Sequence, residues 1–154
     1  MKKALVIFSF CLALLPTLAV AQGLDKYIEL LRSDLRTQKV ELLTDALELT
    51  DAQGPKFWPI QREYQVELDK LQDARIVMIK DYAQSYEKMD ATKATSLMNQ
   101  AFKFQEQRIA LIKKYAGKVS KAVSPTVAAR FGHTEMFLQS IADVQIQGEI
   151  PLVP

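Results

Sequence analysis

The sequence contains one cysteine and one histidine in 154 residues, and this scarcity excludes most catalytic chemistry. Cys11 lies in an apolar run near the N-terminus, where it follows the bulky Phe10 instead of the small residue that lipid attachment requires. His133 is the only possible base of a serine triad, and no G-x-S-x-G segment accompanies it. The sequence also has no glycine-rich phosphate loop and no H-E-x-x-H motif. Because no nucleophile–base pair can be proposed, we expect a protein that is not an enzyme and needs no cofactor.

Metal binding is the remaining chemistry to weigh. His133 and Glu135 are close in sequence, but a single histidine without a second soft ligand rarely holds zinc or copper. Glu41, Asp45 and Glu48 recur at helical spacing, and such a row either holds a cation or forms a solvated acidic face. The solvated face is the favoured interpretation, and we expect no metal site.

Residues 1–21 have the features of a secretory signal peptide. Lys2 and Lys3 precede an apolar run, and residues 19–21 read Ala-Val-Ala, the small-x-small pattern of a cleavage site. The run is too short to span a bilayer comfortably, and an uncleaved anchor is the alternative. We therefore expect a periplasmic protein whose mature part, residues 22–154, is a single domain without cysteine.

Residues 49–89 are the stretch around which the chain is organised. Ten residues recur there at a mean spacing of about 3.6, the period of an α-helix. The pattern predicts a helix from Lys56 to Glu87, about 48 Å long at ~1.5 Å per residue. The recurring residues are Phe57, Ile60, Tyr64, Leu68, Leu71, Arg75, Met78, Tyr82, Tyr86 and Met89.

A capping box is expected at the start of this helix. Thr50 stands three residues before Gln53, so the Thr50 hydroxyl can accept from the Gln53 N–H while the Gln53 side chain reaches back to the Thr50 N–H. Pro55 and Pro59 have no backbone N–H to donate, which predicts kinked or irregular first turns. Trp58, beside them, is interpreted as a packing anchor.

Three further helical regions are predicted, and together they give an all-α, elongated four-helix hairpin-type fold with long central antiparallel helices. The regions are 24–49 with a bend near 36–38, a helix from the N-cap Asp90 to about Ala122, and a helix from Ser124-Pro125 to about Gln147, where Gly148 is a natural stop. The middle one carries a heptad stripe, which predicts shallow antiparallel packing on the central helix. The stripe is Ala94, Met98, Ala101, Gln105, Arg108, Ile112, Tyr115, Val119 and Ala122.

Charge is balanced over the mature chain but not along it. Residues 22–154 contain 18 basic and 18 acidic residues, whereas residues 90–122 carry a net charge of +5. Lys114, Lys118 and Lys121 share one helical face there. This face is either a solvated surface opposite an acidic neighbour or a site for acidic partners such as unfolded chains or anionic headgroups. Nucleic acid is not an expected partner, because the mature chain has no net positive charge.

The segment Leu49-Thr50-Asp51-Ala52-Gln53 matches the L-T-x-x-Q signature of the Spy/CpxP-type periplasmic proteins, which the chain also resembles in size, signal segment and lack of cysteine. The resemblance implies an all-α, four-helix, curved antiparallel dimer with ATP-independent chaperone activity or modulation of an envelope-stress sensor. The chain departs from the family at residues 123–127, where a second signature would lack its glutamine, and in its neutral mature charge. Other segments that resemble secreted relatives are Phe57-Trp58-Pro59, Ala128-Ala129-Arg130-Phe131 with Glu135, and Glu149-Ile150-Pro151-Leu152.

Two function hypotheses follow. The first is a holdase for unfolded or partly folded envelope proteins, and the alternative is a modulator or scaffold that binds one envelope sensor. A membrane surface is a weaker partner. We expect a homodimer with Phe102 or Phe104 at its interface, and an apolar tail, 150–154, that docks on the body or on a second subunit. The expected contact residues are Lys103, Phe104, Arg108, Lys114, Lys118 and Lys121, and the expected structural residues are Leu49, Thr50, Gln53, Trp58, Pro59, Arg130 and Phe131.

Overall fold

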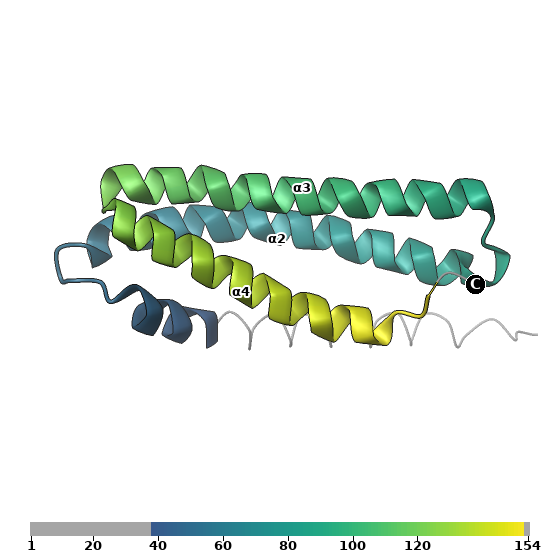
Figure 1. Ribbon diagram of the computed structural model, residues 1–154, viewed down its shortest axis with the longest axis horizontal. Helices are drawn as coiled ribbons and strands as arrows, with labels where there is room; N and C mark the ends of the chain where they lie inside the picture. The colour runs from purple at the N-terminus through teal and green to yellow at the C-terminus, as the bar shows by residue number, and fades with distance from the viewer. Residues whose placement is uncertain (1–37, 153–154) are drawn as a thin grey trace, which may run out of the picture. The chain divides into compact units, whose positions relative to one another are not determined.

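Three long α-helices dominate the computed structural model, which describes residues 38–152 (Figure 1). They are α2 (Gly54–Ser85), α3 (Ala91–Ala122) and α4 (Pro125–Glu149), with one 3-10 turn, η1 (Tyr86–Lys88), between α2 and α3. Residues 38–47 are also helical, and no strand occurs between residues 38 and 152. The all-α class is therefore confirmed. The predicted signal segment and most of the first predicted helical region lie outside the described residues.

Two of the predicted helix starts are confirmed by their caps. The Lys93 N–H donates to Asp90 Oδ1 at 2.7 Å, and the Val127 N–H donates to Ser124 Oγ at 3.2 Å. Each cap satisfies a backbone donor that has no partner inside its helix. The predicted stop at Gly148 is slightly early, because α4 continues through this residue to Glu149.

The start of α2 differs from the predicted capping box. Gln53 Oε1 accepts from the Thr50 N–H at 3.1 Å, as predicted. The reciprocal bond is wrong, because the Gln53 N–H donates to the Thr50 carbonyl oxygen at 2.9 Å instead of to the hydroxyl. Thr50 therefore closes a backbone turn ahead of the helix. The irregular turns predicted from Pro55 and Pro59 as one alternative are wrong, since the α-helix is continuous from Gly54 through Pro59, and a kink within it stays a prediction.

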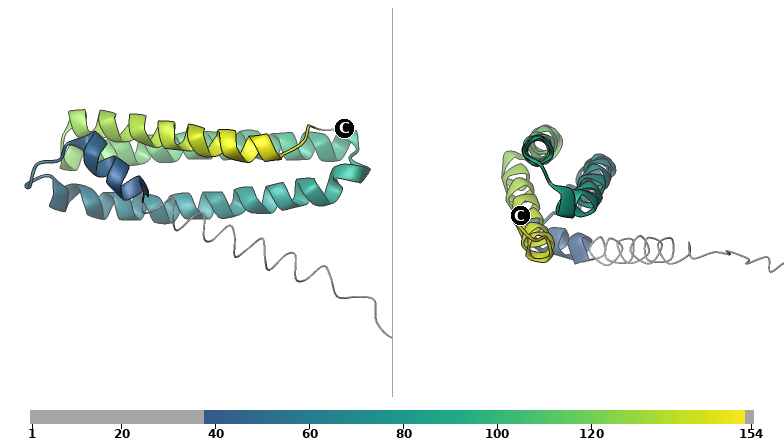
Figure 2. Two further views of the ribbon diagram at one scale, coloured as in Figure 1. Left: turned by 90° about the horizontal axis from the view of Figure 1, so that it is seen from below. Right: turned by 90° about the vertical axis from the view of Figure 1, so that its right-hand side faces the viewer.

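Helix α3 is the central element of the unit that begins at Glu41. α2 and α3 form an antiparallel hairpin, and α4 folds back along α3, so that α2 and α4 run in the same direction (Figure 1). The backbone of α3 packs closely against both partners, whereas the backbones of α2 and α4 have no such close contact. The end-on view in Figure 2 shows α2 and α4 on either side of α3.

An apolar cluster fills one end of this arrangement. It forms where the first half of α2, the second half of α3 and the first turns of α4 meet. Tyr64 and Phe131 lie at its centre with their rings 5.3 Å apart and nearly perpendicular, the edge-to-face geometry that aromatic quadrupoles favour. The members are Leu43, Leu47, Phe57, Tyr64, Leu68, Leu111, Ile112, Tyr115, Val119, Val127, Ala128 and Phe131. Residues 41–68 and 111–131, which hold this cluster, are called the apolar half below.

The two predicted stripes have different outcomes. Every member of the central stripe, from Phe57 to Met89, is buried or half-buried, which confirms that prediction. On α3 the heptad is buried from Arg108 to Val119. In its first part Ala94, Ala101 and Gln105 are half-buried, and the prediction is wrong at Met98, which is 51% exposed, and at Ala122 near the helix end, which is also exposed. A strict seven-residue repeat drifts about 20° per heptad relative to a straight helix, so a stripe that faces the core at one end turns away at the other. Leu97 and Phe104 are the buried residues in that part of α3.

Candidate interaction surface

A buried polar layer takes the place of an apolar core in the other half of the bundle. This polar half comprises residues 71–109 and 135–152. Its buried side chains are mostly charged or amide groups, whereas charged groups are almost never fully buried unless they are paired. They are Arg75, Arg108, Glu135 and Gln139, with only Leu97 and Phe104 as buried apolar companions.

Asp143 joins all three helices within this layer. Its Oδ1 lies 2.7 Å from Arg75 Nη1, while Arg108 donates to Oδ1 at 3.0 Å and to Oδ2 at 2.8 Å. The Phe104 ring lies under both guanidinium groups, 5.1 Å from that of Arg75 and 5.5 Å from that of Arg108. The ring face attracts the cations, and the carboxylate compensates them. One residue of α2, two of α3 and one of α4 thus form a single ionic layer.

The two arginines keep Asp143 ionised. Burial alone raises the pKa of a carboxyl group, because the charged form loses its hydration. The hydrogen bond and charge of Arg108, together with those of Arg75, outweigh this effect, and the pKa of Asp143 lies below its ordinary value. The ionic layer is therefore intact at neutral pH.

Further polar side chains on α4 extend the layer toward the apolar half. Gln139 Oε1 accepts from Gln72 Nε2 at 3.2 Å. One turn earlier, the fully buried Glu135 accepts from the Tyr64 hydroxyl at 2.8 Å. Burial and the Glu135 carboxylate raise the pKa of Tyr64, so its hydroxyl remains a donor. Side chains therefore bridge α2 and α4 where the backbones do not approach each other.

Two of the predicted contact residues belong to this layer. Phe104 is 6% exposed and Arg108 is 7% exposed, each packed against helices of its own chain. The structure therefore corrects their assignment to an exposed binding surface. Sequence spacing places both on the buried side of a helix but does not show that an arginine is buried there with a carboxylate from α4.

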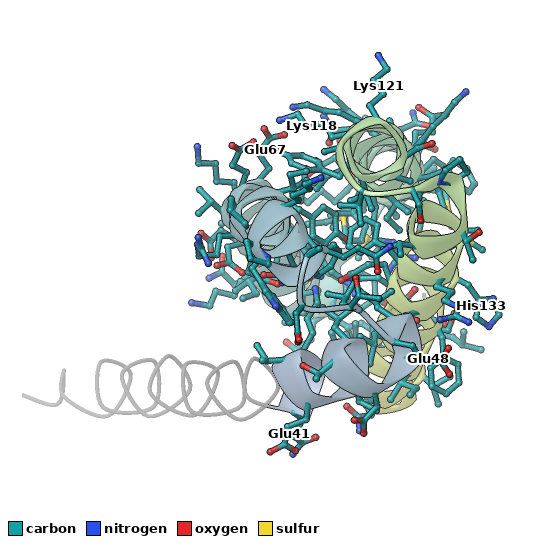
Figure 3. All side chains as sticks on the ribbon, turned by 90° about the vertical axis from the view of Figure 1, so that its left-hand side faces the viewer. Glu41, Glu48, Glu67, Lys118, Lys121 and His133 are labelled. Atoms are coloured by element: carbon teal, nitrogen blue, oxygen red, sulfur yellow. The ribbon has the colours of Figure 1, made fainter. Side chains whose placement is uncertain are left out.

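Lys114 and Lys118 lie on the side of α3 that faces α2, where acidic side chains compensate them. Lys114 Nζ lies 2.8 Å from both carboxylate oxygens of Glu67, and Lys118 Nζ lies 2.7 Å from Glu63. The bond from Lys114 lowers the pKa of Glu67, and the bond to Glu63 raises the pKa of Lys118. Figure 3 shows Glu67 and Lys118 at the same edge of the bundle. These pairs leave little free positive charge for an acidic partner.

Lys103 and Lys121 are the two remaining predicted contact residues. Both are exposed, and neither forms an ion pair within the described part of the chain. Lys121 points away from the bundle near the end of α3 (Figure 3). Lys103 borders a polar strip of α3 that includes Thr95 and Asn99. The basic surface available to a partner is therefore smaller than the charge of residues 90–122 suggests.

The residues expected to shape the fold lie in the apolar half. Phe131 is fully buried, and Leu49 and Trp58 are partly buried against the apolar cluster. The Trp58 ring meets that of Phe57 edge to face at 5.1 Å, which fits the predicted packing anchor. Pro59 lies on an exposed side of α2.

Arg130 holds the end of the helix that precedes α2. Its Nη1 donates to the Leu47 carbonyl at 3.1 Å and lies 2.6 Å from Glu48 Oε2. Glu48 has a φ of 48°, the left-handed conformation with which many helices end. The guanidinium therefore occupies a helix C-terminus, where backbone carbonyls lack partners and a cation is favoured.

Large apolar side chains are exposed in the polar half, and among those on α3 and α4 only Phe102 was predicted to take part in an interface, that of the homodimer. Three lie at helical spacing on α3 and are called the α3 stripe: Met98, Phe102 and Ile109, 51%, 59% and 54% exposed. Four are exposed on α4, Met136 among them at 51%, and the other three are called the α4 stripe: Phe137, Ile141 and Val144, 57%, 41% and 73% exposed. Phe137 is two residues from both Glu135 and Gln139, about 200° around the helix, so the α4 stripe faces away from the polar layer.

The candidate metal ligands do not come together. His133 is exposed on the outer side of α4 (Figure 3), whereas Glu135 is buried against Tyr64. Between residues 38 and 152 no group of three or more His, Cys, Asp or Glu side chains is arranged to hold a metal ion. In the same range, no helix has the length and apolar content needed to cross a membrane.

Searches of protein-family models, curated proteins and solved structures found no match to this chain. The resemblance to the Spy/CpxP-type proteins therefore stays a prediction from the residues that carry it. The function must be inferred from the polar layer and the two exposed stripes.

Proposed function

We propose that this protein is a non-enzymatic, ATP-independent binding protein of the periplasm that holds unfolded or partly folded chains. The observation that carries the proposal is the α3 stripe together with the α4 stripe. Both lie in the half of the bundle whose interior is polar. Their exposed apolar side chains are therefore not the outer edge of a large apolar core. Exposed apolar side chains at helical spacing lie along one face of a helix, the arrangement by which an amphipathic helix contacts a partner chain.

The stripes suit weak binding of many sequences. Each offers three apolar side chains separated by polar ones, which limits the apolar area that one segment can bury. Met98 adds an adaptable side chain, since methionine has several rotatable bonds and packs against varied shapes. Because Lys114 and Lys118 are already paired, apolar contact contributes more than charge, and client binding should depend only weakly on salt.

The proposal is tested by the aggregation of a chemically denatured client with and without the protein. The wild-type protein should suppress aggregation, and a triple serine variant of the α3 stripe should suppress it several-fold less. The matched control is the pair Val66→Ser and Val77→Ser, because these valines are 57% and 67% exposed on α2 and outside both stripes. Equal activity in the stripe variant and the control, or no suppression by the wild type, would contradict the proposal.

The alternative, a modulator of one envelope sensor, gives a different result in a pull-down from envelope extract. One stoichiometric partner favours the modulator, and a broad set of clients favours the holdase. The predicted homodimer is measured separately by sedimentation at micromolar concentration. A stable helical monomer would remove any binding surface composed of two subunits.

A further inference from the structure

An apolar pocket lies at the end of the polar half where η1 joins α2 to α3. Its volume is about 180 Å³, and its polar lining is slight. This is below the 300–1,000 Å³ of a typical small-molecule site, but a cavity of ~150 Å³ is enough to hold one benzene ring. The pocket therefore has room for one or two apolar side chains. It is lined by Met78 and Tyr82 of α2, by Leu97, Met98 and Ala101 of α3, and by Ile150. We call it the tail pocket.

The chain's own C-terminal segment occupies the mouth of the tail pocket. Beyond α4 the chain runs toward the joined ends of α2 and α3 (Figure 1), and Ile150 forms part of the pocket wall. The Tyr82 hydroxyl donates to the Pro151 carbonyl oxygen at 2.7 Å. The expected docking of the tail is therefore confirmed for Ile150 and Pro151. It is wrong for Leu152, which is 88% exposed.

The tail adds little to the apolar cluster that holds the fold together. Ile150 is only half-buried, Pro151 is exposed, and neither belongs to that cluster. The tail begins where α4 ends. It can therefore move away from the pocket while the hydrogen bonds of α4 that precede its last turn stay in place. A segment with so few contacts opens at a small fraction of the free energy of global unfolding.

We propose that the tail pocket binds an extended apolar segment of a client chain, and that Ile150 and Pro151 cover its mouth as an internal competitor when no client is present. This inference rests on the proposed function. The docked tail shows which chemistry fits: an aliphatic side chain at the pocket wall, followed by a backbone carbonyl that accepts from Tyr82. Recognition of a carbonyl group is independent of the side chain, so many client sequences can supply it.

The pocket is continuous with the proposed client surface. Met98 lines the pocket and is also the first residue of the α3 stripe, with Phe102 one turn further along the same face. An extended segment seated in the pocket can therefore continue over the α3 stripe. The tail thus covers one end of a longer apolar surface that consists of the tail pocket and the α3 stripe.

The test uses the full chain and a fluorescent peptide with the sequence of residues 148–154. In an Ile150→Asp variant the tail should leave the pocket, and the peptide should bind at least about tenfold more tightly than to the wild type, because a tethered competitor acts at millimolar effective concentration. A peptide carrying the same Ile-to-Asp change should not bind. Equal peptide affinity for wild type and variant, with circular dichroism showing both folded, would overturn the proposal.

A second variant guards against indirect effects of the aspartate. Ala101→Phe, added to Ile150→Asp, fills the pocket and should abolish peptide binding while the helix content is kept. Tyr82→Phe removes a hydrogen bond that the tail and the peptide share, so it should change the peptide affinity of the otherwise wild-type chain far less than Ile150→Asp does. Peptide binding that survives pocket filling would place the peptide elsewhere and overturn the assignment.

The client assay separates this inference from the proposed function. If clients bind in the pocket, Ile150→Asp should suppress aggregation better than the wild type, and the pocket-filled double variant should lose this gain. If the wild type suppresses aggregation but neither change alters it, the holdase function stands and the tail pocket is not its regulator. If the peptide binds as expected but no variant suppresses aggregation, the pocket exists and the proposed function fails.

Discussion

The apolar half and the polar half of this bundle use the same three helices but hold them together by different physical means. In the apolar half, large side chains such as Phe131 and Tyr64 exclude water and contribute through buried area. In the polar half, Asp143 and its two arginines supply a few directional contacts while apolar side chains remain at the surface. The comparison teaches that the large buried apolar cluster and the two exposed apolar stripes are separated along the length of the helices.

The sharpest way to test this separation is a pair of phenylalanine truncations in α4. Phe131→Ala removes a fully buried ring from the apolar cluster and should lower the free energy of unfolding by about 3–5 kcal/mol. Phe137→Ala, six residues further along the same helix, removes a ring that is 57% exposed and should cost at most about 0.5 kcal/mol. Urea unfolding followed by circular dichroism measures both. Similar losses in the two variants would mean that the α4 stripe is buried in solution.

Loss of the carboxylate in the polar half should have the next largest effect. Asp143→Ala leaves Arg75 and Arg108 buried without their partner and should cost on the order of 3 kcal/mol. The loss should appear as faster amide exchange in the C-terminal half of α4, with the apolar half still protected. The control is Lys114→Ala, which breaks an exposed pair and should cost less than about 1 kcal/mol. Exchange that rises equally in both halves would contradict two separate regions.

The pH dependence of unfolding gives a milder perturbation of the same layer. The pKa of Asp143 is lowered in the folded state, so the unfolded chain binds the proton at a higher pH, near the ordinary value of about 3.9. The contribution of Asp143 is therefore complete above about pH 4 and is lost as the pH falls through its folded-state value. Unfolding midpoints between pH 7 and pH 2.5 should fall less for Asp143→Asn than for the wild type. Parallel curves would show that the arginines do not stabilise the ionised form.

The smallest expected effect lies at the turn before α2. Gln53→Ala removes the side-chain acceptor of the Thr50 N–H and should cost roughly 0.5–1 kcal/mol. Thr50→Ala should cost less, because the bonds that close this turn go to the Thr50 carbonyl oxygen and survive the change. Thermal unfolding of the two variants ranks them. The reverse order would mean that the hydroxyl supplies a cap after all.

Much of the fold was predictable because its signals are local. The caps at Asp90 and Ser124 depend on residues at most three positions apart, and the spacing from Phe57 to Met89 needs no partner to be recognised. The buried face of α3 was predictable through the apolar half and at Arg108, but not at Met98. In the apolar half, the side of α3 that packs against the neighbouring helices is the side on which the apolar residues recur in the sequence.

The polar half could not be predicted in the same way. Arg108 and Asp143 are 35 residues apart, and nothing local marks them as a pair. An arginine on a helix stripe is ordinarily at the surface, so its burial depends on a carboxylate from another helix and on the Phe104 ring beneath it. The exposed α3 stripe follows from the same cause, because the buried positions in that part of α3 are already taken by Leu97 and Phe104.

The side-chain bridges between α2 and α4 also specify the alignment of the two helices. Apolar surfaces tolerate a shift of one helical turn, because one aliphatic contact replaces another at similar free energy. Here α4 contributes an acid, an amide and an acid, which are Glu135, Gln139 and Asp143. They contact a phenol, an amide and a guanidinium on α2, which belong to Tyr64, Gln72 and Arg75. A slide of α4 by one turn would set Gln139 against Tyr64 or Glu135 against Gln72, and a charged group would lose its compensating partner. The polar layer therefore permits only one register of α4 along the hairpin, because each polar group needs a partner of matching chemical type.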